Sequence, residues 1–145
     1  MPIAVLEYPA TRYRTETAPS LADRGERARL SKPGLKAFFK IAAAWMLRDE
    51  DGRALLGGVS NGPFYEMKRD PDRVLDTDRL TRVSYLIGIY KALHILHSDV
   101  LADQWVQLPN SNPIFAGQSP LAYMVRGGLP AMQTVRRLLD ARRAG

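Results

Sequence analysis

The sequence predicts an all-α protein whose helices form a bundle. Apolar residues recur at spacings of three and four in several stretches, which is the period of one face of a helix. Helix-capping residues or prolines precede these stretches, and glycines or charged residues follow them. No stretch shows the strict alternation of apolar and polar residues that predicts a half-buried strand. These three observations favour helices throughout the chain.

The composition narrows the class of protein. Hydrophobic residues make up 46% of the chain, as in an ordinary globular protein, and no apolar run is long enough for a membrane span. The lack of cysteine excludes disulfides and thiolate chemistry, so we expect a soluble protein of the cytoplasm. The net charge of +6 permits contact with nucleic acid or an acidic protein. Because the 21 basic residues are spread along the chain, an ordinary solvated surface explains them equally well.

The N-terminal elements are predicted from caps and breaks. Prolines interrupt residues 1–30, which predicts a tail that is partly ordered at best. The first helix is expected to begin at Ser31, an N-cap residue, with Pro33 in its first turn. The acidic run 49–51 is expected to end this helix and to precede a short second helix over 53–56.

Residues 56–69 show the pattern of a helix-turn-helix, with a glycine turn and a second helix that ends in basic residues. The apolar residues Val59, Phe64 and Met67 are expected to face the core. In a DNA-reading version, the start of the second helix lies in the major groove. A purely structural role is equally supported, because a Gly-Pro pair stands where base-reading side chains belong. The candidate DNA contacts are Ser60, Asn61, Tyr65, Lys68 and Arg69.

A long helix is expected from Thr77 to His97, preceded by Asp76 as part of an acidic cap. Apolar residues occupy more than half of its circumference, which predicts a central helix that is contacted on several sides. A chain of 145 residues has little material to surround such a helix completely. We therefore expect a homodimer.

The C-terminal elements are shorter. A helix is expected over 100–106, followed by a loop over 108–115 whose asparagines typically bond nearby backbone groups. Ser119 and a proline begin the next helix, and a glycine pair ends it because glycine tolerates the left-handed conformation of a helix end. Pro130 begins the last helix, which is expected to run to about Arg143.

No set of residues in the sequence has the pattern of a catalytic or metal-binding site. His94 and His97 lie three apart on the long helix, and Asp99 and Asp103 lie four apart, which are routine spacings for structural and surface residues. The sequence lacks a Gly-rich phosphate loop after a strand and a cysteine that could bind metal. We therefore expect no enzymatic activity, no metal and no cofactor. A small helical enzyme that uses His94 or His97 is the weakest alternative.

The order of parts in the last third of the chain carries a resemblance. A tryptophan segment over 105–110 precedes an Asn/Pro loop with a Phe-x-Gly turn over 112–117, a Ser-Pro helix start, a glycine pair and a terminal helix. This order resembles the toxin-binding domain of the Xre/MbcA/ParS antitoxin family, and especially its ParS-like members. Residues 56–69 resemble the Xre-type helix-turn-helix of the same antitoxins. The resemblance implies a helical bundle with three parts: a tail over 1–30, an Xre-like helix-turn-helix subdomain with the long helix over 31–98, and a small helical toxin-binding domain over 99–145.

The resemblance also implies a partner. Antitoxins of this type pair with a RES-domain toxin that degrades NAD or uses it to modify a target, and their C-terminal end lies against the toxin's active-site cleft. The implied occluding tip is Arg142, Arg143 and the carboxylate of Gly145. The alternative role for these arginines is favourable contact with the negative end of the helix dipole. Aromatic residues and arginines are the usual anchors of protein interfaces, and the further implied toxin contacts are Asn112, Phe115, Tyr123, Arg126 and Arg136.

A second class of function competes with the antitoxin hypothesis. The chain could instead be a helix-turn-helix transcriptional regulator that inhibits no toxin, and an antitoxin dimer could also repress its own operon by binding operator DNA. The tip distinguishes the two hypotheses. Removal of residues 142–145 destroys neutralisation if the chain is an antitoxin, and leaves DNA binding intact if it is only a regulator.

Overall fold

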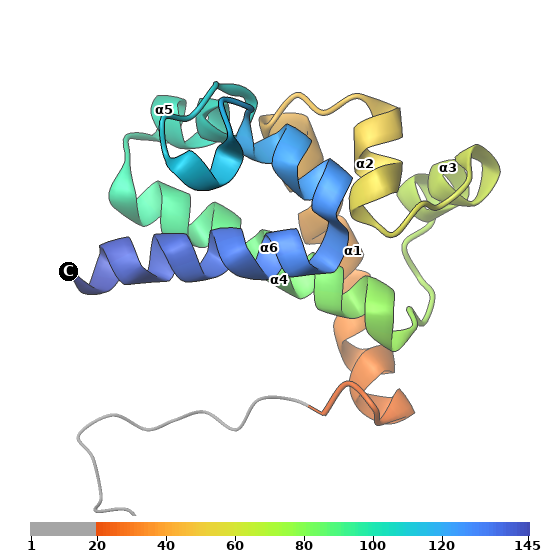
Figure 1. Ribbon diagram of the computed structural model, residues 1–145. Coiled ribbons are helices and arrows are strands. Elements are labelled where there is room, and N and C mark those ends of the chain that lie inside the picture. Colours follow the sequence, from red (N-terminus) through yellow and green to blue (C-terminus); the bar gives the residue numbers. More distant parts are fainter. Residues whose placement is uncertain (1–19) are drawn as a thin grey trace, which may run out of the picture.

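The computed structural model describes residues 20–145, and these residues form helices joined by short connections, without a strand (Figure 1). This confirms the all-α class. Residues 1–19 of the predicted tail lie outside the described residues. None of the helices over 20–145 has both the length and the apolar character that a membrane crossing requires. The elements are α1 (Arg24–Ala44), α2 (Asp49–Leu55), α3 (Asn61–Arg69), α4 (Thr77–Leu96), α5 (Asp99–Gln104), the 3-10 turns η1 (Trp105–Gln107) and η2 (Pro113–Phe115), and α6 (Pro120–Ala144).

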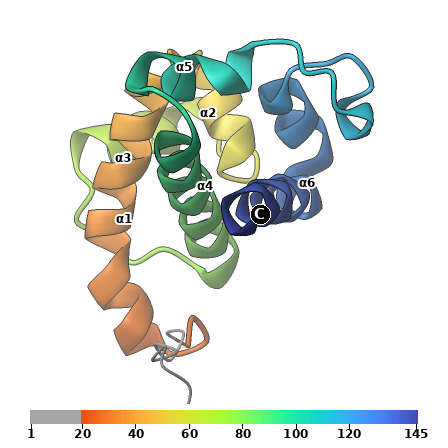
Figure 2. The same cartoon turned by 90° about the vertical axis from the view of Figure 1, so that its left-hand side faces the viewer.

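The long helix α4 lies at the centre, and α1, α5 and α6 pack against it (Figures 1 and 2). Its residues Val83, Leu86, Ile89 and Leu93 are almost completely buried. Each such side chain contributes about 1.5–3 kcal/mol through burial. The prediction of a central helix is confirmed. Ile95, near the end of α4, is the one large apolar side chain of this helix that is exposed.

Helix α1 begins at Arg24, so the predicted start at Ser31 is wrong, and residues 24–30 belong to the helix rather than to a tail. Its cap is Asp23, whose side chain accepts a hydrogen bond from the Gly25 backbone N–H at 3.0 Å. Ser31 is fully buried inside the helix. Its hydroxyl donates to the Arg27 carbonyl at 2.6 Å and accepts from the Leu75 backbone N–H at 2.8 Å. Serine supports either role, because its hydroxyl can cap a helix or bond back to the preceding turn.

The acidic run also lies elsewhere than predicted. Helix α1 ends at Ala44, and residues 49–51 form the first turn of α2 instead of ending α1. Acidic side chains at that position favour the positive N-terminal end of α2. Between the two helices, Met46 adopts a positive φ of 54°. That conformation ends α1 earlier than the sequence indicates.

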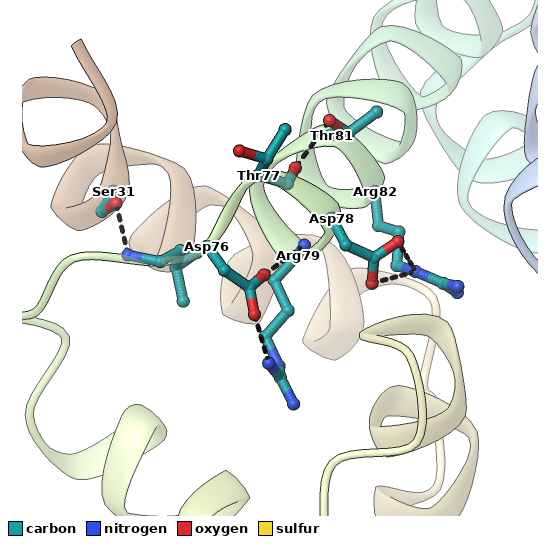
Figure 3. Close-up of polar contacts among 8 residues, drawn as sticks. Ser31, Asp76, Thr77, Asp78, Arg79, Thr81 and Arg82 are labelled. Atoms are coloured by element: carbon teal, nitrogen blue, oxygen red, sulfur yellow. Dashed lines mark hydrogen bonds and ion pairs between the residues drawn. The ribbon is translucent and has the colours of Figure 1, made fainter. Parts of the chain in front are cut away.

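A polar cluster that includes Asp76, Asp78 and Arg82 lies at the start of α4, within the helix and its cap (Figure 3). Asp76 caps α4 by accepting from the Arg79 backbone N–H at 2.8 Å. Arg82 donates through Nε to the Asp78 carboxylate at 3.0 Å. A Cβ on Gly57, which has φ of 94°, would lie 3.2 Å from Arg82 Nε. Arg82 therefore lies beside the turn between α2 and α3, where a side chain larger than hydrogen would crowd it.

One hydrophobic core contains residues from both sides of the predicted boundary between 98 and 99. Leu35 and Phe38 of α1 share it with Val135 and Leu139 of α6. The division into a helix-turn-helix subdomain and a toxin-binding domain stays a prediction.

Candidate functional site

The loop before α6 is held by its own asparagines. The Asn110 side chain accepts from the Asn112 backbone N–H at 2.9 Å, and the Asn112 side chain accepts from the Ile114 backbone N–H at 3.1 Å. The Asn110 backbone N–H also donates to the Gln118 carbonyl at 3.3 Å, which closes the loop. Asn112, a predicted toxin contact, is partly buried and caps η2. The observed role is thus the local backbone role that asparagines take in loops.

Phe115 belongs to the core and not to the surface. Its side chain is 1% exposed and packs edge-on against Trp105, with ring centroids 6.1 Å apart, and against Tyr123 at 5.3 Å. Such edge-to-face pairs are favoured by the ring quadrupoles. Phe115 is therefore buried in this conformation, and its role as a toxin contact stays a prediction. Tyr123, another predicted contact, is partly buried.

Helix α6 bends at Gly128, where φ of 64° and ψ of −147° interrupt the helical backbone. Ser119 caps its start by accepting from the Ala122 backbone N–H at 3.1 Å. The prediction that the glycine pair interrupts the helix before Pro130 is confirmed. Arg126, just before the bend, is exposed and lines a hollow of about 550 Å³ together with Met46 and Gln107.

The predicted contact Arg136 lies against the body of the protein. It is partly buried, and its Nε donates to the Asp140 carboxylate at 2.9 Å. Its guanidinium lies across Gly88 of α4, at the place that a Cβ on this glycine would occupy. This packing fixes the register of α6 along α4 and leaves Arg136 less available to a partner than the arginines that follow it.

The last turn of α6 is exposed. Arg142, Arg143 and Gly145 all lie at the surface, and among residues 20–145 Arg143 forms an ion pair with Asp140 at 3.9 Å. The preceding residues Val135 and Leu139 are fully buried, so the helix that carries these arginines is anchored. In Figure 1 this end of the chain lies at the edge of the molecule, and in Figure 2 it faces the viewer. The tip, defined as residues 142–145, is thus presented to solvent on a fixed helix.

A histidine between two carboxylates was not predicted. His94 of α4 lies 3.0 Å through Nδ1 from Asp99 and 2.9 Å through Nε2 from Asp103, both on α5. Burial alone would lower the pKa of His94, but the hydrogen bonds and charges of the two aspartates outweigh it and raise this pKa above its usual value. Tyr90 packs against the imidazole, with ring centroids 4.2 Å apart and ring planes tilted by 41°. We call His94 with Asp99 and Asp103 the His94 clamp. In the sequence, the signal for it is the spacing of four between the two aspartates, just after the end of a helix.

The faces of α3 are as predicted. Val59, Phe64 and Met67 are buried, whereas the predicted DNA contacts Ser60, Asn61, Tyr65, Lys68 and Arg69 are exposed. Arg69 forms an ion pair with Glu66 at 2.7 Å. The outward face of α3 therefore carries both charges.

Comparisons with known proteins identify the C-terminal part. The family described as the antitoxin Xre/MbcA/ParS C-terminal toxin-binding domain matches residues 91–145. This range contains the end of α4, the His94 clamp, the loop and all of α6. The chain is also 38% identical over 112 residues to the uncharacterized protein y4oB of Sinorhizobium fredii (strain NBRC 101917 / NGR234). The aligned region covers 77% of this chain and 84% of that protein. No solved structure matches the chain. The C-terminal part of the chain, residues 91–145, belongs to the Xre/MbcA/ParS family of antitoxin toxin-binding domains.

Proposed function

We propose that this chain neutralises a cognate RES-domain toxin by placing its C-terminal tip in the toxin's NAD-binding cleft. The observation that carries the proposal is the position of the tip, an exposed basic turn at the end of an anchored helix within the toxin-binding range 91–145. The toxin either degrades NAD or transfers ADP-ribose to a target. In this proposal the antitoxin works in the cytoplasm and acts by binding alone.

The chemistry of the tip favours an acidic cleft. The guanidinium groups of Arg142 and Arg143 form two parallel hydrogen bonds with a carboxylate where the geometry permits. A helix end that is fixed before binding loses little conformational freedom on insertion. We expect acidic groups at the mouth of the toxin's cleft, where an inserted tip excludes the substrate.

A growth assay tests the proposal. A cognate RES-domain toxin is co-expressed with the full antitoxin and with a variant that lacks residues 142–145. Only the full chain is expected to restore growth. If the shortened chain restores growth equally well, the tip is not the inhibitory element. If neither chain restores growth, the antitoxin assignment toward this toxin is wrong.

Operator binding is a second candidate function, and the exposed face of α3 favours it. Lys68 and Arg69 provide positive charge beside the polar residues Ser60 and Asn61. Binding of the operon's promoter DNA is expected to weaken steeply between 50 and 200 mM salt, since phosphate contacts release counterions. Fluorescence anisotropy measures this slope, and an affinity that is indifferent to salt would exclude phosphate-mediated DNA binding.

We also propose that the antitoxin is a homodimer within the toxin–antitoxin assembly. An apolar groove of about 580 Å³ between α1 and α4, lined by residues that include Leu30, Val83 and Ile87, supports this proposal, with a second copy as its occupant. Light scattering of the purified antitoxin measures its mass. A Leu30→Glu variant is expected to be monomeric, and a monomeric full-length protein would contradict the proposal.

A further inference from the structure

Exposed apolar side chains gather where α4 turns into α5. Ile95 is 62% exposed, Val100 70% and Leu101 39%. All three belong to the range that matches the toxin-binding domain. Single exposed apolar residues are normal on a protein surface, whereas large contiguous apolar patches mark interaction sites. We name these three residues the apolar corner.

The segment that carries Val100 and Leu101 is anchored to the core on its inner side. Ala102, Trp105 and Val106, which follow on α5 and η1, are buried in the core. The His94 clamp joins α4 to both Asp99 and Asp103 of α5. Val100 and Leu101 therefore lie on a short helix whose inner side is fixed, and binding through them requires little ordering of the chain.

The apolar corner and the tip of α6 lie toward the same side of the molecule. Helix α4 and the second half of α6 contact each other, cross obliquely, and both run toward that side (Figures 1 and 2). Their register is set where the guanidinium of Arg136 crosses Gly88. Leu96 ends α4 eight residues beyond Gly88, and Ala144 ends α6 eight residues beyond Arg136. With a rise of about 1.5 Å per residue, both helices end about 12 Å past this contact.

We infer that the apolar corner and the tip form one continuous toxin-binding surface, in which Ile95, Val100 and Leu101 anchor the toxin beside the cleft that the tip enters. The inference rests on the proposed function and adds a second contact to it. Its partner is an apolar recess on the toxin with an acidic rim, because an apolar anchor beside arginines is a common interface arrangement. A second copy of this chain fits less well, since two-fold pairing through this face would bring the basic tips of both copies together.

Calorimetric titration of the full chain into a catalytically inactive form of a cognate RES-domain toxin tests the inference. The Val100→Ser/Leu101→Ser and Ile95→Ser variants are expected to bind at least tenfold more weakly than the unchanged chain. Val74→Ser is the matched control, because Val74 is 40% exposed but lies outside the toxin-binding range. It is expected to change the affinity less than twofold. Circular dichroism verifies that each variant keeps its helix content.

The outcomes separate this inference from the proposed function. If the corner variants bind as tightly as the unchanged chain, while deletion of residues 142–145 still abolishes growth rescue, the inference is wrong and the proposed function stands. If the corner variants lose self-association in light scattering and keep their toxin affinity, the corner is a contact between copies, which also overturns the inference. If the full chain does not bind the toxin at all, both fail.

Discussion

The outward face of α3 and the tip of α6 are both exposed and both carry arginines, yet they differ in what surrounds these arginines. On α3, Arg69 is paired with Glu66 at 2.7 Å. At the tip, Arg143 lies 3.9 Å from Asp140, and Arg142 precedes it on a helix whose inner residues are fully buried. The difference teaches that positive charge alone does not identify a binding surface. The anchoring of α6 and the family match over 91–145 favour the tip as the toxin contact.

The largest expected effect separates anchoring residues from surface residues. Phe115→Ala removes a ring that is 1% exposed and packs against Trp105 and Tyr123. It is expected to lower the free energy of unfolding by about 3–5 kcal/mol. Tyr65→Ala on α3, where the side chain is 63% exposed, is expected to change it by less than about 0.5 kcal/mol. Urea denaturation measures both. Equal effects would show that Phe115 does not anchor the C-terminal region.

The next effect concerns the two surfaces themselves. Arg142→Glu/Arg143→Glu is expected to weaken toxin binding about ten- to a hundredfold, because it places negative charge against an acidic cleft. Lys68→Glu/Arg69→Glu is expected to leave toxin affinity unchanged and to abolish binding of promoter DNA. Calorimetry and fluorescence anisotropy measure the two affinities. A loss of toxin affinity in the α3 variant would remove the distinction between the surfaces.

The smallest expected effect is a pH dependence of the protein's stability, which arises from His94 next to the apolar corner. The pKa of His94 is higher in the folded than in the unfolded chain, because Asp99 and Asp103 stabilise the imidazolium. The stabilisation is therefore complete below the unfolded pKa of about 6.5 and is lost as pH rises through the higher folded pKa. Partly exposed ion pairs contribute about 0.2–1 kcal/mol. Thermal unfolding between pH 6 and 8 should show a falling midpoint in the natural chain and a flatter profile in His94→Gln. A parallel fall in both would assign the pH dependence to other groups.

Helical periodicity predicts which residues are buried more reliably than it predicts which ones bind. The core positions Val59, Phe64 and Met67 follow from their spacing, and the interruption before Pro130 follows from the glycine pair. The start of α1 does not follow, because a serine hydroxyl can cap a helix or bond the preceding turn, as Ser31 does.

The candidate site depends on contacts that are distant in the sequence. Phe115 lies in a loop, where no period indicates that Trp105 and Tyr123 cover it. Arg136 has the same side chain as Arg142, and only the approach of Gly88 from α4 distinguishes the two. The His94 clamp depends on how α5 folds back on α4. The exposed arginines of the tip follow from the sequence, because the last turn of a terminal helix has few neighbours.

The most direct test of the central claim measures access of NAD to the toxin's active site. The inactive toxin is saturated with the full antitoxin or with the variant that lacks residues 142–145, at concentrations at which both remain bound. A non-hydrolysable NAD analogue is then titrated into each complex. Occlusion by the tip predicts that the analogue binds the complex of the shortened chain about as tightly as it binds free toxin, and does not bind the complex of the full chain. Equal binding of the analogue to both complexes would contradict the claim.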